Sequence, residues 1–167
     1  LSNINKLKKL DDYLPNDSLI ISSDLKRTIK TATEIQNMRE RLPNNKNLRE
    51  FNFGEWELKK SSEIAAKYPK LSKDYWTSPG DIAPPNGESW NQAAKRINAE
   101  VDNINEKYKG KNIIAVGHFG VILTQLQRAA KIQPQSAISF QIDNLSITHL
   151  EHLGDKNWRI LSVNNIV

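Results

Sequence analysis

Apolar residues along the chain recur with two different periods, which predict strands and helices in alternation. Short apolar runs within 18–22 and 113–117 predict buried strands, because a strand covered on both faces of a sheet lacks polar alternation. Apolar residues spaced three and four apart predict helices. The expected helices cover about 2–13, 26–41, 61–68 and 90–108, and a last one ends near Ala130. Two β-type segments, 146–151 and 158–163, follow, with Gly154 and Asp155 in the turn between them.

Local signals place the ends and faces of these helices. Ser2 is the expected N-cap of the first helix, and Ser89 with Gln92 fits a capping box that starts the helix near residue 90. Gly110 ends that helix. Its core face is expected at Ala93, Ile97, Val101, Ile104 and Tyr108. The 26–41 helix is expected to align Ile29, Ala32, Thr33 and Gln36.

Strands that alternate with helices predict an α/β fold with a largely parallel sheet. The 167 residues show no break in composition, which predicts a single domain over 1–167. The segment 74–86 contains Pro79-Gly80 and Pro84-Pro85 and is expected to be an irregular excursion from that domain.

Composition narrows the class of protein. Apolar residues (38%) and charged residues (26%) occur at ordinary globular levels, and no run of about 18 apolar residues predicts a membrane span. The absence of cysteine excludes disulfides and thiolate metal sites and suits a reducing compartment, so we predict a cytoplasmic protein. The net charge of +5 is spread along the chain without a nucleic-acid motif, so no nucleic-acid partner is expected. The sequence has too few histidines and carboxylates clustered at ligand spacing to predict a metal site, and no other cofactor is expected.

A predicted strand-to-helix junction at 22–32 carries Ser23 and Arg27. The N–H groups at a helix N-terminus favour an anion, and a guanidinium adds a charged fork that matches phosphate or carboxylate. The junction is therefore a candidate anion site. A solvated surface arginine is the alternative.

The segment 48–57 interleaves Glu50, Glu55 and Glu57 with three aromatic residues and Gly54. Apolar walls raise the pKa of a carboxyl group toward the working pH, as acid–base catalysis requires. The alternative is an aromatic-anchored loop with exposed acids.

The apolar run at 113–117 ends at Gly117-His118 and continues through Gly120 into an apolar helix. A histidine at the carboxyl end of a parallel strand lies where open α/β sheets bind ligands. A structural histidine is the alternative reading of His118.

Taken together, these segments resemble the histidine phosphatase superfamily, whose fold is that of phosphoglycerate mutase. The chain carries Ser-x-Leu-x-Arg-x-x-x-Thr-Ala at 23–32, Leu-x-Glu-x-x-x-Gly-x-Trp-Glu at 48–57, Pro-x-Gly-Glu-Ser at 85–89 and Gly-His-x-Gly at 117–120, in the family's order. The resemblance implies a three-layer α/β/α fold with a mostly parallel sheet. The compact chain looks most like the phosphatase branch, which includes α-ribazole phosphatase.

The resemblance implies hydrolysis of a small-molecule phosphate ester through a phosphohistidine intermediate. Arg27 is expected to bind the phosphoryl group, His118 to donate to a phosphoryl oxygen, and Glu50 to act as general acid and then general base. Ser23 and the N–H groups of Phe119 and Gly120 are the other expected phosphate-binding groups.

One element of the family is absent from the sequence. The nucleophilic histidine belongs to an Arg-His-Gly motif on the first strand, which does not occur here, and the second phosphate-binding arginine has no counterpart. The start at Leu1-Ser2 resembles the opening of the family's first helix, so the N-terminal strand is expected upstream of Leu1. As given, the chain is expected to bind phosphate without forming phosphohistidine. Loss of the strand is the competing hypothesis.

Several alternatives stay open from the sequence. Glu55 and Glu57 compete with Glu50 for the acid role, and Glu88 is read as structural, before a helix. His149 and His152 match no motif and are read as strand residues.

Two departures from the family concern size: Leu58 and Phe119 stand where many members have glycine, and the phenyl ring is expected to narrow the pocket. The lysines at 67, 70 and 73 suit a multiply charged ester or a solvated surface equally. Phosphoglycerate-mutase-type phosphoryl transfer and a non-catalytic phosphate-binding relative are the alternative functions. The oligomeric state is not predicted.

Overall fold

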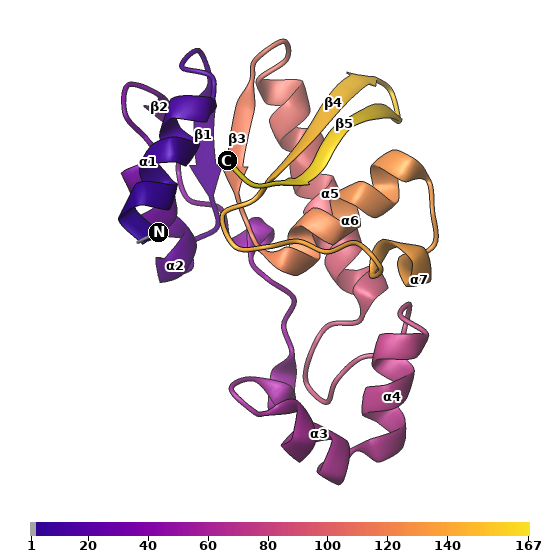
Figure 1. Ribbon diagram of the computed structural model, residues 1–167. Helices are drawn as coiled ribbons and strands as arrows, with labels where there is room; N and C mark the ends of the chain where they lie inside the picture. Colours follow the sequence, from indigo (N-terminus) through magenta and orange to yellow (C-terminus); the bar gives the residue numbers. More distant parts are fainter. Residues whose placement is uncertain (1–2) are drawn as a thin grey trace.

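The computed structural model describes residues 3–167, with side chains from Asn5 onward, so the expected cap at Ser2 lies outside the described residues. The helices are α1 (Asn3–Tyr13), α2 (Lys26–Glu34), α3 (Ser61–Lys67), α4 (Pro69–Thr77), α5 (Trp90–Lys107), α6 (Phe119–Ala130) and α7 (Pro134–Ala137). Two 3-10 helices are η1 (Lys46–Leu48) and η2 (Gly54–Trp56). The strands are β1 (Leu19–Ser22), β2 (Glu40–Arg41), β3 (Ile113–Val116), β4 (Ile147–Gly154) and β5 (Asn157–Asn165) (Figure 1).

Three strands form a parallel sheet in the order β2-β1-β3. Ser22, the last residue of β1, lies opposite Val116, the last residue of β3. Because the two strands run in the same direction and end together, the segments that follow them leave the sheet at one edge. Residues 23–27 and 117–120, which are distant in sequence, are thereby brought together.

Helices cover both faces of this sheet. Leu19 and Ile21 of β1 pack in a cluster with Ile104 of α5, whereas Ile20 packs on the other face with α1 and with Ala32 of α2. All four residues of β1 are buried. Alternate positions of one strand therefore serve two helical layers, which explains why the run lacks polar alternation and confirms the predicted α/β fold.

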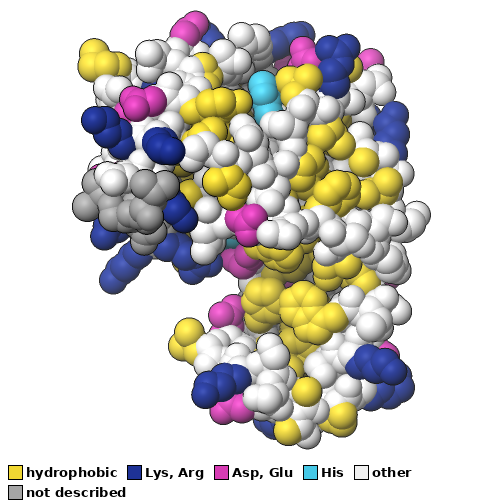
Figure 2. Space-filling view, viewed as in Figure 1, with side chains coloured by type: hydrophobic (Ala, Val, Ile, Leu, Met, Phe, Trp, Pro, Cys, Tyr) yellow, Lys and Arg dark blue, Asp and Glu magenta, His cyan; other side chains and the backbone are white. Residues whose placement is uncertain are grey.

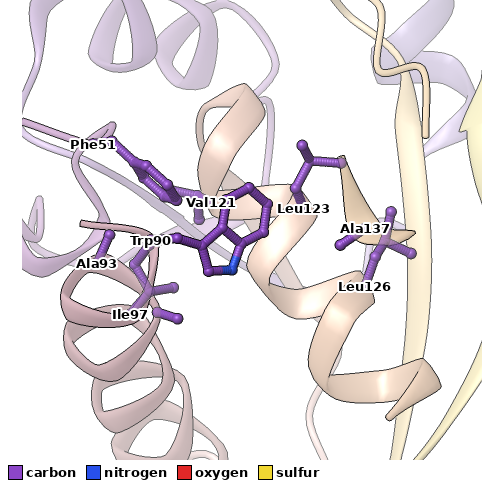
Figure 3. Packing of buried hydrophobic residues seen from close by; sticks show 9 residues of the cluster. Phe51, Trp90, Ala93, Ile97, Val121, Leu123, Leu126 and Ala137 are labelled. Carbon is purple, nitrogen blue, oxygen red and sulfur yellow. The ribbon is translucent and has the colours of Figure 1, made fainter. Parts of the chain in front are cut away.

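The largest core cluster lies where α5, α6 and α7 meet (Figure 3). Trp90 and Ile97 of α5 pack there with Leu123 and Leu126 of α6. Phe51 also belongs to this cluster, with its ring edge-on to that of Trp90 at a centroid distance of 5.4 Å. The side chain that follows Glu50 is therefore anchored in the core. β4 and β5 form a separate antiparallel hairpin that packs against α6.

The predicted start and core face of α5 are confirmed. The Ser89 hydroxyl accepts a hydrogen bond from the Gln92 N–H at 3.2 Å, and the Gln92 amide oxygen accepts one from the Ser89 N–H at 2.8 Å. Ala93, Ile97 and Ile104 of the predicted stripe are buried.

The predicted helix over 26–41 is wrong in its second half. α2 ends at Glu34, Asn37 takes a φ of 45°, and Glu40–Arg41 forms β2 beside β1. The buried Arg39 guanidinium fixes this turn. It donates to the carboxylate of Asp11 and to carbonyl oxygens of Leu14, Pro15 and Ile35.

The buried face of α2 also differs from the predicted one. Thr28, Ala32 and, just after the helix, Ile35 are buried, whereas Thr33 is exposed and Gln36 lies beyond the helix. Thr28 lies on the buried side of the helix, where its hydroxyl oxygen is 2.7 Å from that of Ser23, which follows β1.

The expected irregular excursion over 74–86 begins later than predicted, because α4 continues to Thr77. Pro69 opens α4 at a position where its missing N–H leaves no bond unmade. α3 and α4 form a small lobe that projects from the body of the molecule (Figure 1). Tyr75 of α4 is buried against Trp56 of η2, with ring centroids 5.3 Å apart. Among residues 3–167, no helix combines the length and apolar character needed to cross a membrane.

Candidate active site

Three of the residues predicted to bind phosphate meet where β1 and β3 end. His118 lies at the N-cap of α6, and its Nε2 is 2.8 Å from the hydroxyl oxygen of Ser23, which directly follows β1. Arg27, in the first turn of α2, places Nη2 at 3.0 Å and Nε at 3.3 Å from His118 Nδ1. The strand register described above makes this meeting possible across 91 to 95 residues of sequence.

These hydrogen bonds define which ring nitrogen of His118 carries the proton. A guanidinium has donors only, so Nδ1 must accept from Arg27, and the proton of a neutral ring lies on Nε2. Nε2–H therefore donates to Ser23, and Ser23 donates to the Thr28 hydroxyl at 2.7 Å. Thr28 in turn donates to the carbonyl oxygen of Leu25 at 2.9 Å. The chain of donors runs in one direction, and each buried hydroxyl is satisfied.

His118 is neutral in this arrangement. Its side chain is buried, with only 6% of the residue's surface exposed. Burial lowers the pKa of the imidazole to about 4, and the positive charge of Arg27 adds to the effect. Arg27 can donate to Nδ1 because that nitrogen carries no proton in the neutral ring.

Glu50 lies at the N-terminus of the same helix. Its Oε1 accepts hydrogen bonds from the N–H groups of Phe51 at 3.0 Å and Gly120 at 3.1 Å. Burial raises the pKa of the Glu50 carboxyl, while the two backbone hydrogen bonds and the charge of Arg27 oppose the rise. Glu50 therefore combines a raised pKa with a fixed position, two properties of a general acid.

Glycine at position 120 is required for this contact. A Cβ atom there would lie 2.5 Å from Glu50 Oε1 and 2.8 Å from the ring of Phe51. The Gly120 N–H was predicted to bind a phosphoryl oxygen, and in this structure it donates to Glu50. The absence of a side chain at Gly120 therefore allows the Glu50 carboxylate to approach the start of α6.

Arg96 of α5 holds the loop that carries Glu50. Its guanidinium makes a bidentate ion pair with Glu88, with both contacts at 2.8 Å, and donates to the carbonyl oxygens of Asn47 and Arg49. Glu88 also accepts from the N–H of Asn52 at 2.9 Å. Glu88 is therefore a structural residue, as predicted, although it acts through Arg96 and not through a helix dipole alone. Sequence analysis missed Arg96, because no motif marks it among the charged residues of α5.

The loop of the Pro-x-Gly-Glu-Ser motif packs tightly against the Glu50 loop. A Cβ atom on Gly54, which has a φ of 53°, would lie 2.2 Å from the carbonyl oxygen of Pro85. A Cβ atom on Gly87 would lie 2.5 Å from the carbonyl oxygen of Asn52. Glycine at both positions therefore allows the backbones of the two motifs to pack directly against each other.

The other carboxylates of the 48–57 segment point elsewhere. Glu55 accepts from the Tyr68 hydroxyl at 2.6 Å, and Glu57 accepts from the N–H of Phe53 at 3.1 Å. Glu55 therefore contacts the residue between α3 and α4, and Glu57 contacts the backbone of its own loop. His149 is exposed on β4, and His152 lies against Trp158 at the hairpin end. Within residues 3–167, no group of three or more carboxylate or histidine side chains converges in the manner of a metal site.

A cleft opens beside Glu50, between the lobe and the body of the molecule. It is narrow, with a cavity volume of about 20 Å³, and is lined mostly by aromatic side chains. The aromatic side chains are Phe51, Phe53, Tyr75, Trp76, Trp90 and Phe119. Figure 2 shows hydrophobic side chains gathered at this junction. The lysines of the lobe do not line the cleft, since Lys67 pairs with Glu55 and Lys70 with Asp74.

Known proteins resemble this chain in sequence and in fold. A metal-independent phosphoserine phosphatase from Arabidopsis thaliana is 29% identical over 150 residues, which make up 88% of this chain and 61% of that protein. YhfR from Bacillus stearothermophilus superposes with a TM-score of 0.86 at 20% identity, covering 100% of this chain and 85% of YhfR. The α-ribazole phosphatase of Shigella flexneri superposes with a TM-score of 0.80 at 20% identity, covering 97% and 81%.

The similarity extends along nearly the whole of this chain but not along its relatives. The chain spans roughly half the length of the curated proteins it matches, between 40% and 68%. The structural superpositions confirm the predicted fold. The model of the histidine phosphatase superfamily, branch 1, matches residues 5–166. The chain therefore belongs to the histidine phosphatase superfamily.

Proposed function

We propose that this protein hydrolyses small phosphomonoesters through a phosphohistidine intermediate. The observation that carries the proposal is the convergence of two kinds of group at the N-terminus of α6. His118 binds Ser23 and Arg27 at the N-cap, and two residues later the N–H of Gly120 binds Glu50. A phosphate-binding cluster thus adjoins a protonatable carboxyl, as general acid catalysis of phosphoester cleavage requires.

The phosphoryl group binds, in this proposal, between Arg27 and the start of α6. Arg27 is exposed to solvent and carries a permanent charge, and the 12-residue helix α6 presents its positive end there. The N–H of Phe119 is a further donor, and the imidazole of His118 becomes one when Nδ1 is protonated and Arg27 turns from it to the phosphoryl group. A bound phosphoryl group raises the pKa of His118 and favours its charged, two-donor form.

Glu50 moves the protons in both halves of the reaction. In the first half, the bond between phosphorus and the leaving oxygen breaks as a histidine nitrogen bonds to phosphorus, and the leaving oxygen takes the Glu50 proton. In the second half, water bonds to phosphorus, the nitrogen–phosphorus bond breaks, and Glu50 takes a proton from the water. Splitting the reaction in this way lowers the barrier of each step.

The nucleophile in this proposal is a histidine upstream of Leu1, on a strand that pairs with β3. Within the described part of the chain, β3 pairs with β1 on one side only, and β4 and β5 form a sheet of their own. β3 is incompletely covered, with Ala115 exposed, whereas β1 is buried throughout. An apolar edge of this kind is a template for a further strand. A strand parallel to β3 there would end beside His118.

The alternative functions have less support. Phosphoglycerate-mutase-type transfer requires a cation for the carboxylate of the sugar acid, but the charged residue that lines the cleft is Glu50. A non-catalytic relative would keep Glu50 and His118 away from water, at a cost in desolvation, without chemistry that uses them.

The proposal predicts that protein extending upstream of Leu1 becomes phosphorylated on histidine. Mass spectrometry of the intact purified protein first shows whether its mass exceeds 19.0 kDa and whether the upstream peptide contains Arg-His-Gly. Rapid quenching with a phosphomonoester should then trap an acid-labile phosphoryl group on that histidine. Residues 1–167 alone should bind inorganic phosphate without turnover. Turnover by residues 1–167 would show that the roles are assigned wrongly, and a natural start at Leu1 would contradict catalysis.

Replacement of Glu50 by glutamine should lower kcat about 100- to 10,000-fold, because the amide cannot donate and recover a proton. The matched control is Glu57→Gln, which changes a carboxylate of the same segment that accepts from the Phe53 N–H and does not contact α6. Steady-state rates with phosphomonoesters measure the effect. A kcat for Glu50→Gln within a few-fold of the parent enzyme would assign the acid role elsewhere.

Replacement of Gly120 by alanine should lower kcat about 100-fold, because the new methyl group displaces the Glu50 carboxylate from its position. Phosphate affinity should change much less, since Arg27 and His118 are not displaced. Gly117→Ala is the control, because its Cβ would make only an ordinary 3.5 Å contact with Val121. Equal losses in both variants would point to a general effect on the start of α6.

His118 should titrate near pH 4 in the free protein and at higher pH in saturating inorganic phosphate. Because an unfolded histidine titrates near pH 6.5, acidification from about 6.5 to 4 should also destabilise the native state, which cannot take up the proton. NMR titration of the imidazole, with chloride at equal ionic strength as the control, measures the shift. A His118 pKa that phosphate leaves unchanged would remove His118 from the phosphate site.

A further inference from the structure

The cleft beside Glu50 has two aromatic walls from different parts of the chain. Trp76 of the lobe packs near Phe53, the residue before η2, with ring centroids 6.2 Å apart, and Phe119 comes from the start of α6 in the body. Trp76 and Phe119 keep 48% and 44% of their surface exposed, although both are large and apolar. Such exposure at the mouth of a cleft marks a surface that a ligand covers.

We propose that the organic group of the substrate packs against the exposed aromatic side chains at the mouth of this cleft, which thereby selects uncharged aromatic alcohols. The inference rests on the proposed function, because Glu50 must reach the leaving oxygen and Glu50 itself lines the cleft. The group attached to that oxygen then lies against Trp76 and Phe119. Aromatic rings pack on other rings in edge-on or offset geometry, as the ring pairs of this cluster already do.

The charges around the cleft disfavour the opposite class of substrate. Among the described residues that line the cleft there is no lysine or arginine, so an organic group with its own carboxylate would find no counterion there. The nearby cations are engaged elsewhere: Arg96 binds Glu88, and Lys67 binds Glu55. A phosphorylated hydroxy acid or amino acid would lose hydration of its charge in this cleft without gaining an ion pair.

Phe119 also explains the size limit of the selection. Its side chain stands where many family members have glycine, and it occupies the residue between His118 and Gly120. The phenyl ring therefore lies beside both the phosphate-binding cluster and the Glu50 carboxylate. A flat ring can fit beside it, whereas a branched or strongly hydrated group would lose contact with one wall.

The test compares two esters of primary alcohols, so that the intrinsic reactivity of the bond is similar. 2-Phenylethyl phosphate carries an aromatic ring, and O-phosphoserine carries a carboxylate and an ammonium group. For the full-length natural chain, kcat/KM should be at least about 10-fold higher for the aromatic ester. Binding of 2-phenylethylphosphonate and 2-amino-3-phosphonopropanoate, which cannot be hydrolysed, should differ in the same direction by calorimetry.

Two variants test the walls. Trp76→Ala and Phe119→Ala should each lower the ratio of the two kcat/KM values about 10-fold, mainly through the aromatic ester. Leu161→Ala is the matched control, because this residue is 50% exposed on β5 and lies outside the cleft. It should leave the ratio unchanged.

The outcomes separate the two proposals. If no phosphomonoester is hydrolysed by the full-length chain, the proposed function fails. If both esters are hydrolysed with equal kcat/KM, or if the two alanine variants leave the ratio unchanged, the function stands and aromatic selectivity is refuted.

Discussion

The site depends on the hydrogen bond between the Glu50 carboxylate and the N–H of Gly120. This bond joins a loop to a residue 70 positions later in the chain, in the first turn of α6, next to His118. It needs a residue without a side chain at position 120 and an anchored neighbour at position 51. Both conditions are met by packing, since Phe51 is fixed in the main core. Core packing and site geometry are therefore one constraint, and a change in either alters the other.

Burial sets the protonation of the two titratable groups in opposite ways. Removing Glu50 from water raises the pKa of its carboxyl, whereas removing His118 from water lowers the pKa of its imidazole. In the free protein, both groups are thereby biased toward their neutral forms, although Arg27 brings a permanent charge to the same place. In the proposed function, Arg27 is the cation that receives the phosphoryl group, and Glu50 is the neighbouring group that transfers the proton. A low dielectric strengthens both interactions once the substrate excludes water.

Sequence predicted the features that depend on local pattern. The strands β1 and β3 and the helix after Ser89 follow from short apolar runs, a capping box and a 3.6-residue stripe. The resemblance to the family predicted that Arg27, Glu50 and His118 belong to one site, because the motifs that carry them occur in the family's order.

What sequence did not predict depends on contacts between distant segments. α2 stops at Glu34, and the buried Arg39 then donates to the carbonyl oxygens of Leu14 and Pro15 after α1 and of Ile35 after α2. Arg96 reaches the carbonyl oxygens of a loop about 47 residues away. The Gly120 N–H was assigned to phosphate because the approach of Glu50 to it is a matter of tertiary packing. No local spacing encodes these partners.

The proposed site has a phosphate end and an organic end, which are formed by different parts of the fold. The phosphate end is built from strand ends, a helix terminus and Arg27, which are dictated by the topology of the sheet. The organic end is built by Phe119 and by a lobe that contributes little to the sheet. Residues in the lobe can change without disturbing the register of β1 and β3. In the proposed function, substrate choice is therefore free to vary while the phosphoryl chemistry stays fixed, and the aromatic lining is the choice that we propose for this chain.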